Sequence, residues 1–183
     1  MSKEKRILLA GFGGQGIIFM GKLLALAAMK EGKNVTWMPS YGAEVRGGTA
    51  HSMVVVSDEE IAVPYVREPD LCVVMNNPSL ERFEEAVKKG GEVFVNISLC
   101  DTKIKRKDVK VVEIPATRLA QEIGNANVAN MIMLGALTAE TGLCNLKTLI
   151  DCLEEVVPTH RKDLIPLNKR ALEEGASLST CKR

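Results

Sequence analysis

RILLAGFGGQG, residues 6–16, is the stretch that decides the fold. Residues 6–10 predict a short buried strand, and residues 11–16 predict a glycine-rich loop. The next segment, 17–30, carries apolar side chains at helical spacing, and Gly32 follows it as a predicted C-cap. A second strand is predicted at 34–38. The opening of the chain is therefore one strand–helix–strand unit, for which we expect parallel strands and a right-handed crossover.

The rest of the chain continues the alternation of strands and helices. A buried strand is predicted at 71–75, and two more strands are predicted at 92–97 and 109–114. An antiparallel hairpin is predicted from 52–56 and 61–66, joined by the acidic turn 57–60, with Pro64 placing its second strand at an edge. A helix is predicted at 77–89, with Asn77 as N-cap and Pro78 at its first position, ending at Gly90 and Gly91. Further helices are predicted at 116–123, 128–140, 146–156 and 164–174.

This pattern predicts an α/β fold of the Rossmann-like three-layer type. We expect a mixed, mainly parallel sheet, an antiparallel hairpin and a helical C-terminal region. The 183 residues suit a single domain spanning 1–183, because no repeat, linker or low-complexity segment interrupts them.

Composition excludes several classes of partner. The formal net charge is +1 and only 4% of residues are aromatic, so we expect no nucleic acid and no membrane surface as ligand. Glycines interrupt the apolar run near the N-terminus, which argues against a signal peptide. No stretch approaches the roughly 18 apolar residues of a membrane span. A cytoplasmic location is expected.

The five cysteines do not form a recognisable metal or redox motif. Cys72, Cys100, Cys144, Cys152 and Cys181 are odd in number, and no two of them have C-x-x-C spacing. We therefore expect reduced structural cysteines and no metal-binding residues. Any iron–sulfur clusters used with this chain are expected on another chain.

The glycine loop is the first candidate binding site. Gly11, Gly13 and Gly16 fit G-x-G-x-x-G, and Gly14 and Gln15 lie between them. Glycines allow backbone N–H groups to approach an anion at a helix N-terminus. A dinucleotide site also needs an acidic residue near the end of the second strand, where the chain has no carboxylate until Glu44. Nicotinamide or flavin binding is therefore disfavoured, whereas an anion, another subunit's backbone, or close packing alone remain open.

A second cluster of functional residue types follows the strand at 34–38. It contains Tyr41, Glu44, Arg46, Gly47 and Gly48, and the order of elements places it at the same carboxyl edge as the glycine loop. The planar guanidinium of Arg46 suits phosphate or carboxylate. The alternative is a surface ion pair between Arg46 and Glu44 in a glycine-rich turn.

A third motif lies at 125–137. Asn125, Asn127 and Asn130 could cap the helix that begins there or contact a partner, and the sequence leaves both roles open. The apolar residues of this motif are predicted to be core; they are Met131, Ile132, Leu134 and Leu137.

Together these motifs resemble a known family. GFGGQGI (11–17), MPSYGAEVRGGTAHSMVVVSDEEIAVPYVREPD (38–70) and NANVANMIMLGAL (125–137) occur in the order found in gamma subunits or domains of 2-oxoacid:ferredoxin oxidoreductases. The resemblance covers about residues 5–143. It implies a subunit of an enzyme that converts a 2-oxoacid, coenzyme A and oxidised ferredoxin to acyl-CoA, carbon dioxide and reduced ferredoxin, and that is inactive as a single chain.

The resemblance also implies where the cofactors of such an enzyme lie. Thiamine diphosphate and Mg belong to alpha and beta subunits, and iron–sulfur clusters belong to beta or to a ferredoxin-like delta subunit. No cofactor is expected on this chain alone, and no catalytic residue is assigned, since His51 has no evident partner in the sequence. Expected partners are the alpha, beta and delta-type subunits and, through the complex, ferredoxin; a homodimer is an option for the isolated chain.

The segment 41–50 more nearly resembles the 2-oxoglutarate or branched-chain 2-oxoacid type, and we favour 2-oxoglutarate. The alternative function is a free-standing Rossmann-type nucleotide-binding or regulatory module.

Overall fold

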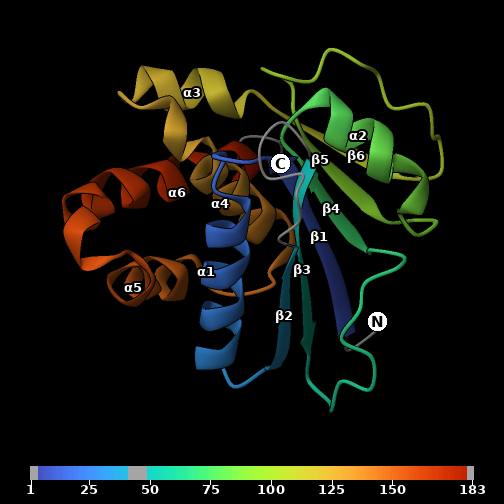
Figure 1. The fold of residues 1–183 in the computed structure, drawn as a ribbon, viewed down its shortest axis with the longest axis horizontal. Coiled ribbons are helices and arrows are strands. Elements are labelled where there is room, and N and C mark those ends of the chain that lie inside the picture. The colour runs from blue at the N-terminus through green and yellow to red at the C-terminus, as the bar shows by residue number, and fades with distance from the viewer. Residues whose placement is uncertain (1–3, 41–48, 181–183) are drawn as a thin grey trace.

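One mixed six-stranded sheet organises the chain (Figure 1). The computed structural model describes residues 4–40 and 49–180. The strand order is β2-β3-β1-β4-β5-β6. The strand bounds are β1 Glu4–Phe12, β2 Asn34–Ser40, β3 Thr49–Ser57, β4 Leu71–Val74, β5 Glu92–Asn96 and β6 Lys110–Ile114.

Two halves of the sheet differ in direction. β1, β4, β5 and β6 are parallel neighbours, whereas β3 is antiparallel to both β1 and β2. β2 therefore runs parallel to β1, as the opening strand–helix–strand unit predicts. The two strands are not adjacent, however, because β3 lies between them.

The predicted hairpin is wrong in its second strand. Residues 61–66 form no strand, and β3 instead makes its antiparallel pairs with β2 on one side and β1 on the other. Both hydrogen-bonding edges of β3 are thus occupied, so a following strand has no edge to join. Pro64, which lacks a backbone N–H, also fits poorly in a strand. The antiparallel hairpin of the fold is β2–β3.

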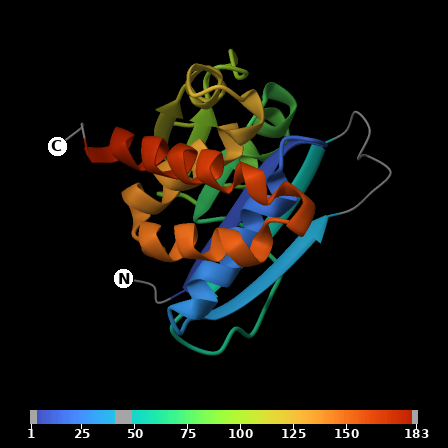
Figure 2. The same cartoon turned by 90° about the vertical axis from the view of Figure 1, so that its left-hand side faces the viewer.

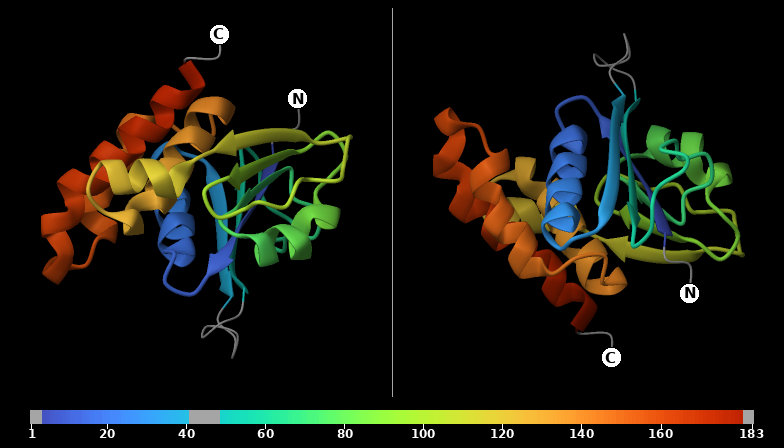
Figure 3. Two further views of the ribbon diagram at one scale, coloured as in Figure 1. Left: turned by 90° about the horizontal axis from the view of Figure 1, so that it is seen from above. Right: turned by 90° about the horizontal axis from the view of Figure 1, so that it is seen from below.

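Helices cover both faces of the sheet, so the predicted three-layer α/β fold is confirmed (Figure 3). α1 and the three last helices lie on one face and α2 on the other; in Figure 2, α5 and α6 lie in front of α1. The α-helix bounds are α1 Ile17–Lys30, α2 Asn77–Phe83, α3 Ala116–Glu122, α4 Ala129–Thr141, α5 Leu146–Val156 and α6 Ile165–Thr180. The 3₁₀ helices in the described residues are η2 Glu84–Ala86, η3 Ala126–Val128 and η4 Thr159–Leu164. No helix in the described ranges is long and apolar enough to cross a membrane.

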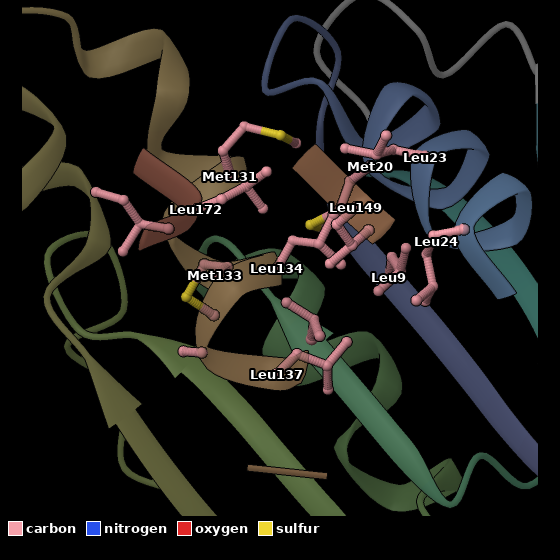
Figure 4. Close-up of a cluster of buried hydrophobic side chains, with 14 of the residues drawn as sticks. Leu9, Met20, Leu23, Leu24, Met131, Met133, Leu134, Leu137, Leu149 and Leu172 are labelled. Atoms are coloured by element: carbon pink, nitrogen blue, oxygen red, sulfur yellow. The ribbon is translucent and has the colours of Figure 1, made fainter. Parts of the chain in front are cut away.

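Alternate residues of the strands belong to two separate apolar clusters, one on each face of the sheet. Ile7 and Leu9 of β1 belong to the larger cluster under α1, α4, α5 and α6, whereas Leu8 belongs to the smaller cluster under α2. Figure 4 shows the larger cluster, where side chains of α1 and α4 meet Leu9. The predicted core residues of the third motif are confirmed, since Met131, Ile132, Leu134 and Leu137 are fully buried.

The start and end of α2 differ from the prediction. Asn76, not Asn77, is the N-cap, and its side-chain Oδ1 accepts a 3.0 Å hydrogen bond from the Ser79 N–H. The α-helix ends at Phe83 and passes into η2, short of residue 89. Long-range contacts fix this end, because the Glu84 carboxylate accepts the backbone N–H of Arg106 at 3.0 Å and the Arg106 guanidinium bonds the carbonyl of Val87.

The last helix runs farther than predicted, to Thr180 instead of residue 174. Gly175 does not end this helix. It lies inside α6, at the point where α6 crosses close to α4. A Cβ there would collide with the carbonyl oxygen of Ile132, and a Cβ on Gly135 would collide with that of Leu172. The glycines are needed for the approach of the two backbones.

Candidate functional site

The carboxyl ends of β1, β4, β5 and β6 lie at the same edge of the sheet, because these strands are parallel. The glycine loop follows β1 at this edge, and Asn76 follows β4 close by. Open α/β sheets bind ligands at such edges. The predicted position of the glycine loop, between a strand and a helix, is confirmed.

The glycine loop needs glycine at two positions for backbone conformation. Gly14 has φ +96° and Gly16 has φ +72°, both in the left-handed region. The N–H of Gln15 donates to the carbonyl of Phe12 at 3.1 Å and closes the turn. Gly11 has a packing role, because a Cβ there would lie 2.6 Å from Gln15 Oε1 and 2.8 Å from Ile17 Cδ1.

The Gln15 side chain holds the loop in place. Its Oε1 accepts the N–H of Phe12 at 2.7 Å and Nδ2 of Asn76 at 2.9 Å. Asn76 is in turn the N-cap of α2. The one amide oxygen therefore links the loop after β1 to the start of the helix on the other face.

Asn130 joins the starts of α1 and α4. Its Nδ2 donates to the carbonyl of Gly16 at 3.2 Å, and a Cβ on Gly16 would collide with this same side chain. Neither Gly16 nor Val128, the N-cap residues of the two helices, provides a side-chain hydrogen bond to the first turn. At α4, however, the Ala129 N–H donates to the Ala126 carbonyl and the Met131 N–H donates to Asn130 Oδ1 at 2.9 Å. The N-terminus of α1, which has no side-chain cap, is therefore the one that favours negative charge.

A pocket of about 380 Å³ opens beside these two N-termini. Its basic residues, His160 and Arg161, come from η4, between α5 and α6. Within the described residues the Arg161 side chain makes no hydrogen bond or ion pair. The polar and glycine residues of the wall are Gly14, Gly16, Asn125, Asn127, Asn130 and Asn168. This lining can bind an anionic group through the guanidinium of Arg161 and the backbone N–H groups at the start of α1.

Of the three asparagines singled out in the sequence, the structure gives two a local role. Asn125 Oδ1 accepts the N–H of Asn127 at 3.0 Å and caps η3, and Asn130 bonds Gly16. All three also line the pocket. Sequence reasoning missed His160, Arg161 and Asn168, because only the chain path after α5 brings them to the glycine loop.

The second predicted cluster, Tyr41, Glu44, Arg46, Gly47 and Gly48, lies outside the described residues. The strand ends on either side of it are at the expected edge, since Thr49 pairs with Phe12 in the sheet. His51 points elsewhere: its ring packs edge-on against Phe83 of α2, with 5.4 Å between ring centroids.

The sheet order argues against a dinucleotide site of the ordinary kind. In such a site the ribose carboxylate stands at the end of the strand next to β1. Here β3 occupies that place, and β2 lies a further strand spacing away, about 10 Å from β1.

The described cysteines are structural. Cys72, Cys100, Cys144 and Cys152 are buried and free, and burial raises the pKa of the first three thiols to about 12. Within residues 4–40 and 49–180, no group of three His, Cys, Asp or Glu side chains could hold a metal ion. Cys181 lies outside the described residues.

The sequence from residue 6 to residue 178 matches the family described as pyruvate ferredoxin/flavodoxin oxidoreductase. The chain belongs to this family. Within it, the chain corresponds to the gamma subunit of 2-oxoacid:ferredoxin oxidoreductases, as the sequence resemblance predicts.

Curated relatives of two kinds are similar over nearly the whole chain. The 2-oxoglutarate synthase subunit KorC of Methanocaldococcus jannaschii is 40% identical, and the alignment covers 91% of each chain. The ketoisovalerate oxidoreductase subunit VorA of Methanothermobacter marburgensis is 38% identical over 95% of this chain. The chain spans only about a third of VorA, 36% of its length.

Solved structures of the family share the fold. The gamma subunit of a keto/oxoacid ferredoxin oxidoreductase from Geobacter sulfurreducens has a TM-score of 0.81 and 28% identity, with 94% of this chain and 96% of that chain covered. The 2-oxoglutarate:ferredoxin oxidoreductase of Magnetococcus marinus has a TM-score of 0.88 and 26% identity, with 99% of this chain and 32% of that chain covered. That enzyme was solved with 2-oxoglutarate, coenzyme A and succinyl-CoA bound.

Proposed function

We propose that the chain works as the gamma subunit of an assembled enzyme that oxidises a 2-oxoacid with coenzyme A and passes the electrons to ferredoxin. The observation that carries this proposal is the match to KorC over 91% of both chains. The free-standing nucleotide-binding module is the weaker candidate, since neither the strand order nor the residues at the end of β2 suit a ribose.

For the substrate we favour 2-oxoglutarate. The segment 41–50 resembles the 2-oxoglutarate or branched-chain type, and KorC of Methanocaldococcus jannaschii is 40% identical, against 38% for VorA. The test is co-expression of the chain with its alpha and beta-type partners, followed by ferredoxin or viologen reduction with 2-oxoglutarate, 3-methyl-2-oxobutanoate and pyruvate. The highest kcat/KM is expected for 2-oxoglutarate, and a clear preference for another acid would overturn this assignment.

Thiamine diphosphate, Mg and the iron–sulfur clusters are proposed to lie on the partner subunits. The described cysteines do not form a cluster site, and the described residues include no metal-binding group. The isolated chain should therefore contain no iron and no thiamine diphosphate and reduce no viologen. Viologen reduction by the pure single chain would contradict the proposal that it is inactive alone.

Coenzyme A is the proposed ligand at this edge of the sheet. Its phosphates suit the N-terminus of α1 and the guanidinium of Arg161, which makes no ion pair with any described residue. We extend the proposed site to the glycine loop, Gly11 to Gly16, and to the second cluster, Tyr41, Glu44, Arg46, Gly47 and Gly48. In this site Gly11 and Gln15 shape the loop, and Gly14, Gly16 and Arg161 contact the phosphates.

The arginines provide the test of this site. In the assembled enzyme, Arg46→Ala and Arg161→Ala should each raise the apparent KM for coenzyme A about tenfold to a hundredfold, the effect of losing one charge-assisted contact. Arg46→Lys should raise this KM nearly as much as Arg46→Ala does, because a lysine lacks the planar guanidinium group. Arg170→Ala on α6, exposed and outside the pocket, is the control.

Subunit co-elution separates two roles of Arg46. A raised KM with intact assembly supports a ligand role, and loss of co-elution supports an ion pair with a partner subunit. If Arg46→Ala and Arg161→Ala both behave as Arg170→Ala does, the anion site is misplaced, although the subunit assignment would stand.

We propose that residues 1–183 form a single gamma-type domain in the cytoplasm, with alpha, beta and delta-type partners. One sheet runs through both apolar clusters, and the free buried cysteines suit a reducing compartment. Without partners the chain should form a homodimer, because apolar side chains such as Ile97 and Leu99 are exposed. Light scattering of the purified chain tests this, and a strict monomer would contradict it.

A further inference from the structure

The connection from β3 to β4, residues 58–70, is fixed across the face that α2 covers. Val66 is buried in the smaller apolar cluster. The Arg6 guanidinium donates to the carbonyl of Tyr65 at 3.2 Å, and Asp70 Oδ2 accepts the Arg6 N–H at 3.0 Å. Residues 61–66 of this segment, which the sequence predicts as a strand, form no strand, and the segment presents Tyr65 and Arg67 at the surface.

Beside this segment lies a pocket of about 340 Å³, on the opposite face of the sheet from the pocket that Arg161 lines. Its floor is apolar and consists of Leu8, Met53 and Val66, all members of the smaller cluster. The volume is at the lower end of that of small-molecule sites, which is about 300 Å³ to 1,000 Å³. It suits one ring or one branched chain.

Aromatic and cationic side chains form the rest of the pocket. The rings of His51 and Phe83 pack edge-on, and the guanidinium of Arg82 lies 5.3 Å from the centre of the Phe83 ring. Tyr65 and Arg67 complete the rim. The lining, as far as the structure describes it, has no acidic side chain, and Arg67 makes no ion pair with any described residue.

We propose that this pocket binds a small monocarboxylate with an apolar or aromatic body. The carboxylate lies against the guanidinium of Arg67, and the body covers Leu8, Met53 and Phe83. The Arg67 guanidinium, which makes no ion pair with any described residue, attracts an anion, and the apolar floor favours a ligand that removes it from water. Inorganic phosphate meets only the first requirement. This inference goes beyond the proposed function and does not depend on it.

The test uses the full chain and NMR of methyl-labelled methionine. The Met53 methyl reports on the floor, and Met29 on α1, exposed and remote, is the internal control. Phenylacetate and 3-methyl-2-oxobutanoate should shift the Met53 signal and leave Met29 unchanged, with a Kd on the order of 1 mM or tighter. The neutral amide, phenylacetamide, and inorganic phosphate should bind at least about tenfold more weakly.

Arg67→Gln should weaken phenylacetate binding at least about tenfold, because it removes one charge-assisted contact without touching the core. Arg170→Gln is the matched control and should bind as the original chain does. Equal binding of acid and amide, or unchanged binding by Arg67→Gln, would overturn the proposal. So would binding that the isolated chain shows but the assembled enzyme lacks, since a partner side chain would then be the natural occupant.

Discussion

Gln15 Oε1 lies 2.9 Å from Asn76 Nδ2, so the loop after β1 and the N-cap of α2 share one hydrogen bond. The same oxygen accepts the Phe12 N–H, and the Asn76 Oδ1 accepts the Ser79 N–H. Two loops from neighbouring parallel strands are thus fixed relative to one another. The conformation of the glycine loop depends on this link as well as on its glycines.

Replacing Gln15 should loosen the loop. Gln15→Ala removes both accepted hydrogen bonds and should cost about 1–2 kcal/mol in the free energy of unfolding. Gln15→Glu keeps the acceptor oxygen and should cost less. A double-mutant cycle of Gln15→Ala with Asn76→Ala, measured by urea unfolding, should give a coupling energy of about 0.5 kcal/mol or more. Strict additivity would show that the link contributes nothing.

Gly16 and Gly14 should respond differently to a methyl group. Both are left-handed, so alanine costs about 1–2 kcal/mol of backbone strain at either position. At Gly16 the new Cβ would also collide with Asn130, whereas at Gly14 it meets open space. Gly16→Ala should therefore unfold at clearly lower urea concentration than Gly14→Ala. Equal midpoints would mean that Asn130 can move away without cost.

The crossing of α4 and α6 should not tolerate side chains. Gly135→Ala and Gly175→Ala place a Cβ against a carbonyl of the other helix. Alanine gains up to about 1 kcal/mol of helix propensity, yet overpacking typically costs about 1–3 kcal/mol and here meets rigid backbone. A lower melting temperature is expected for each variant, by several degrees. Ser177→Ala, exposed on the same helix, is the control; a rise in melting temperature for either glycine variant would contradict the close crossing.

The buried thiols should be almost inert in the folded protein. Burial raises the pKa of Cys72 from 9.0 to about 12, so its thiolate is about a thousandfold rarer than in the unfolded chain at neutral pH. In a Cys181→Ser variant, iodoacetamide at about pH 8 should label the native protein very slowly and the urea-unfolded protein readily. Rapid labelling of the native protein would contradict burial.

The same shift has a consequence for stability. Between about pH 9 and pH 12 the folded protein holds the thiol proton that the unfolded chain releases, so stability falls as the pH rises through this range. Below about pH 9 both states are protonated and the thiols have no effect. The urea midpoint of unfolding, measured from pH 8 to pH 10.5, should decline over the upper part of that range and should decline less in Cys72→Ala.

Local patterns in the sequence determined the α/β class, the strand and helix around the glycine loop, and the core face of α4. Each depends on residues near one another in the chain: Gly16 sets its own φ, and apolar spacing selects the buried face at 131–137. The order of three motifs was also enough to indicate the family. These features need no knowledge of which strand pairs with which.

Pairing and distant contacts were decided only by the tertiary structure. Residues 61–66 have the composition of a strand, but β1 and β2 already occupy both edges of β3, so the segment instead forms one side of a pocket. Arg161 has no local signal and lines the pocket beside the glycine loop only because η4 returns to the start of α1. Competition for one hydrogen-bonding edge and the return of a distant helix are properties of the whole chain, and no short window of sequence contains them.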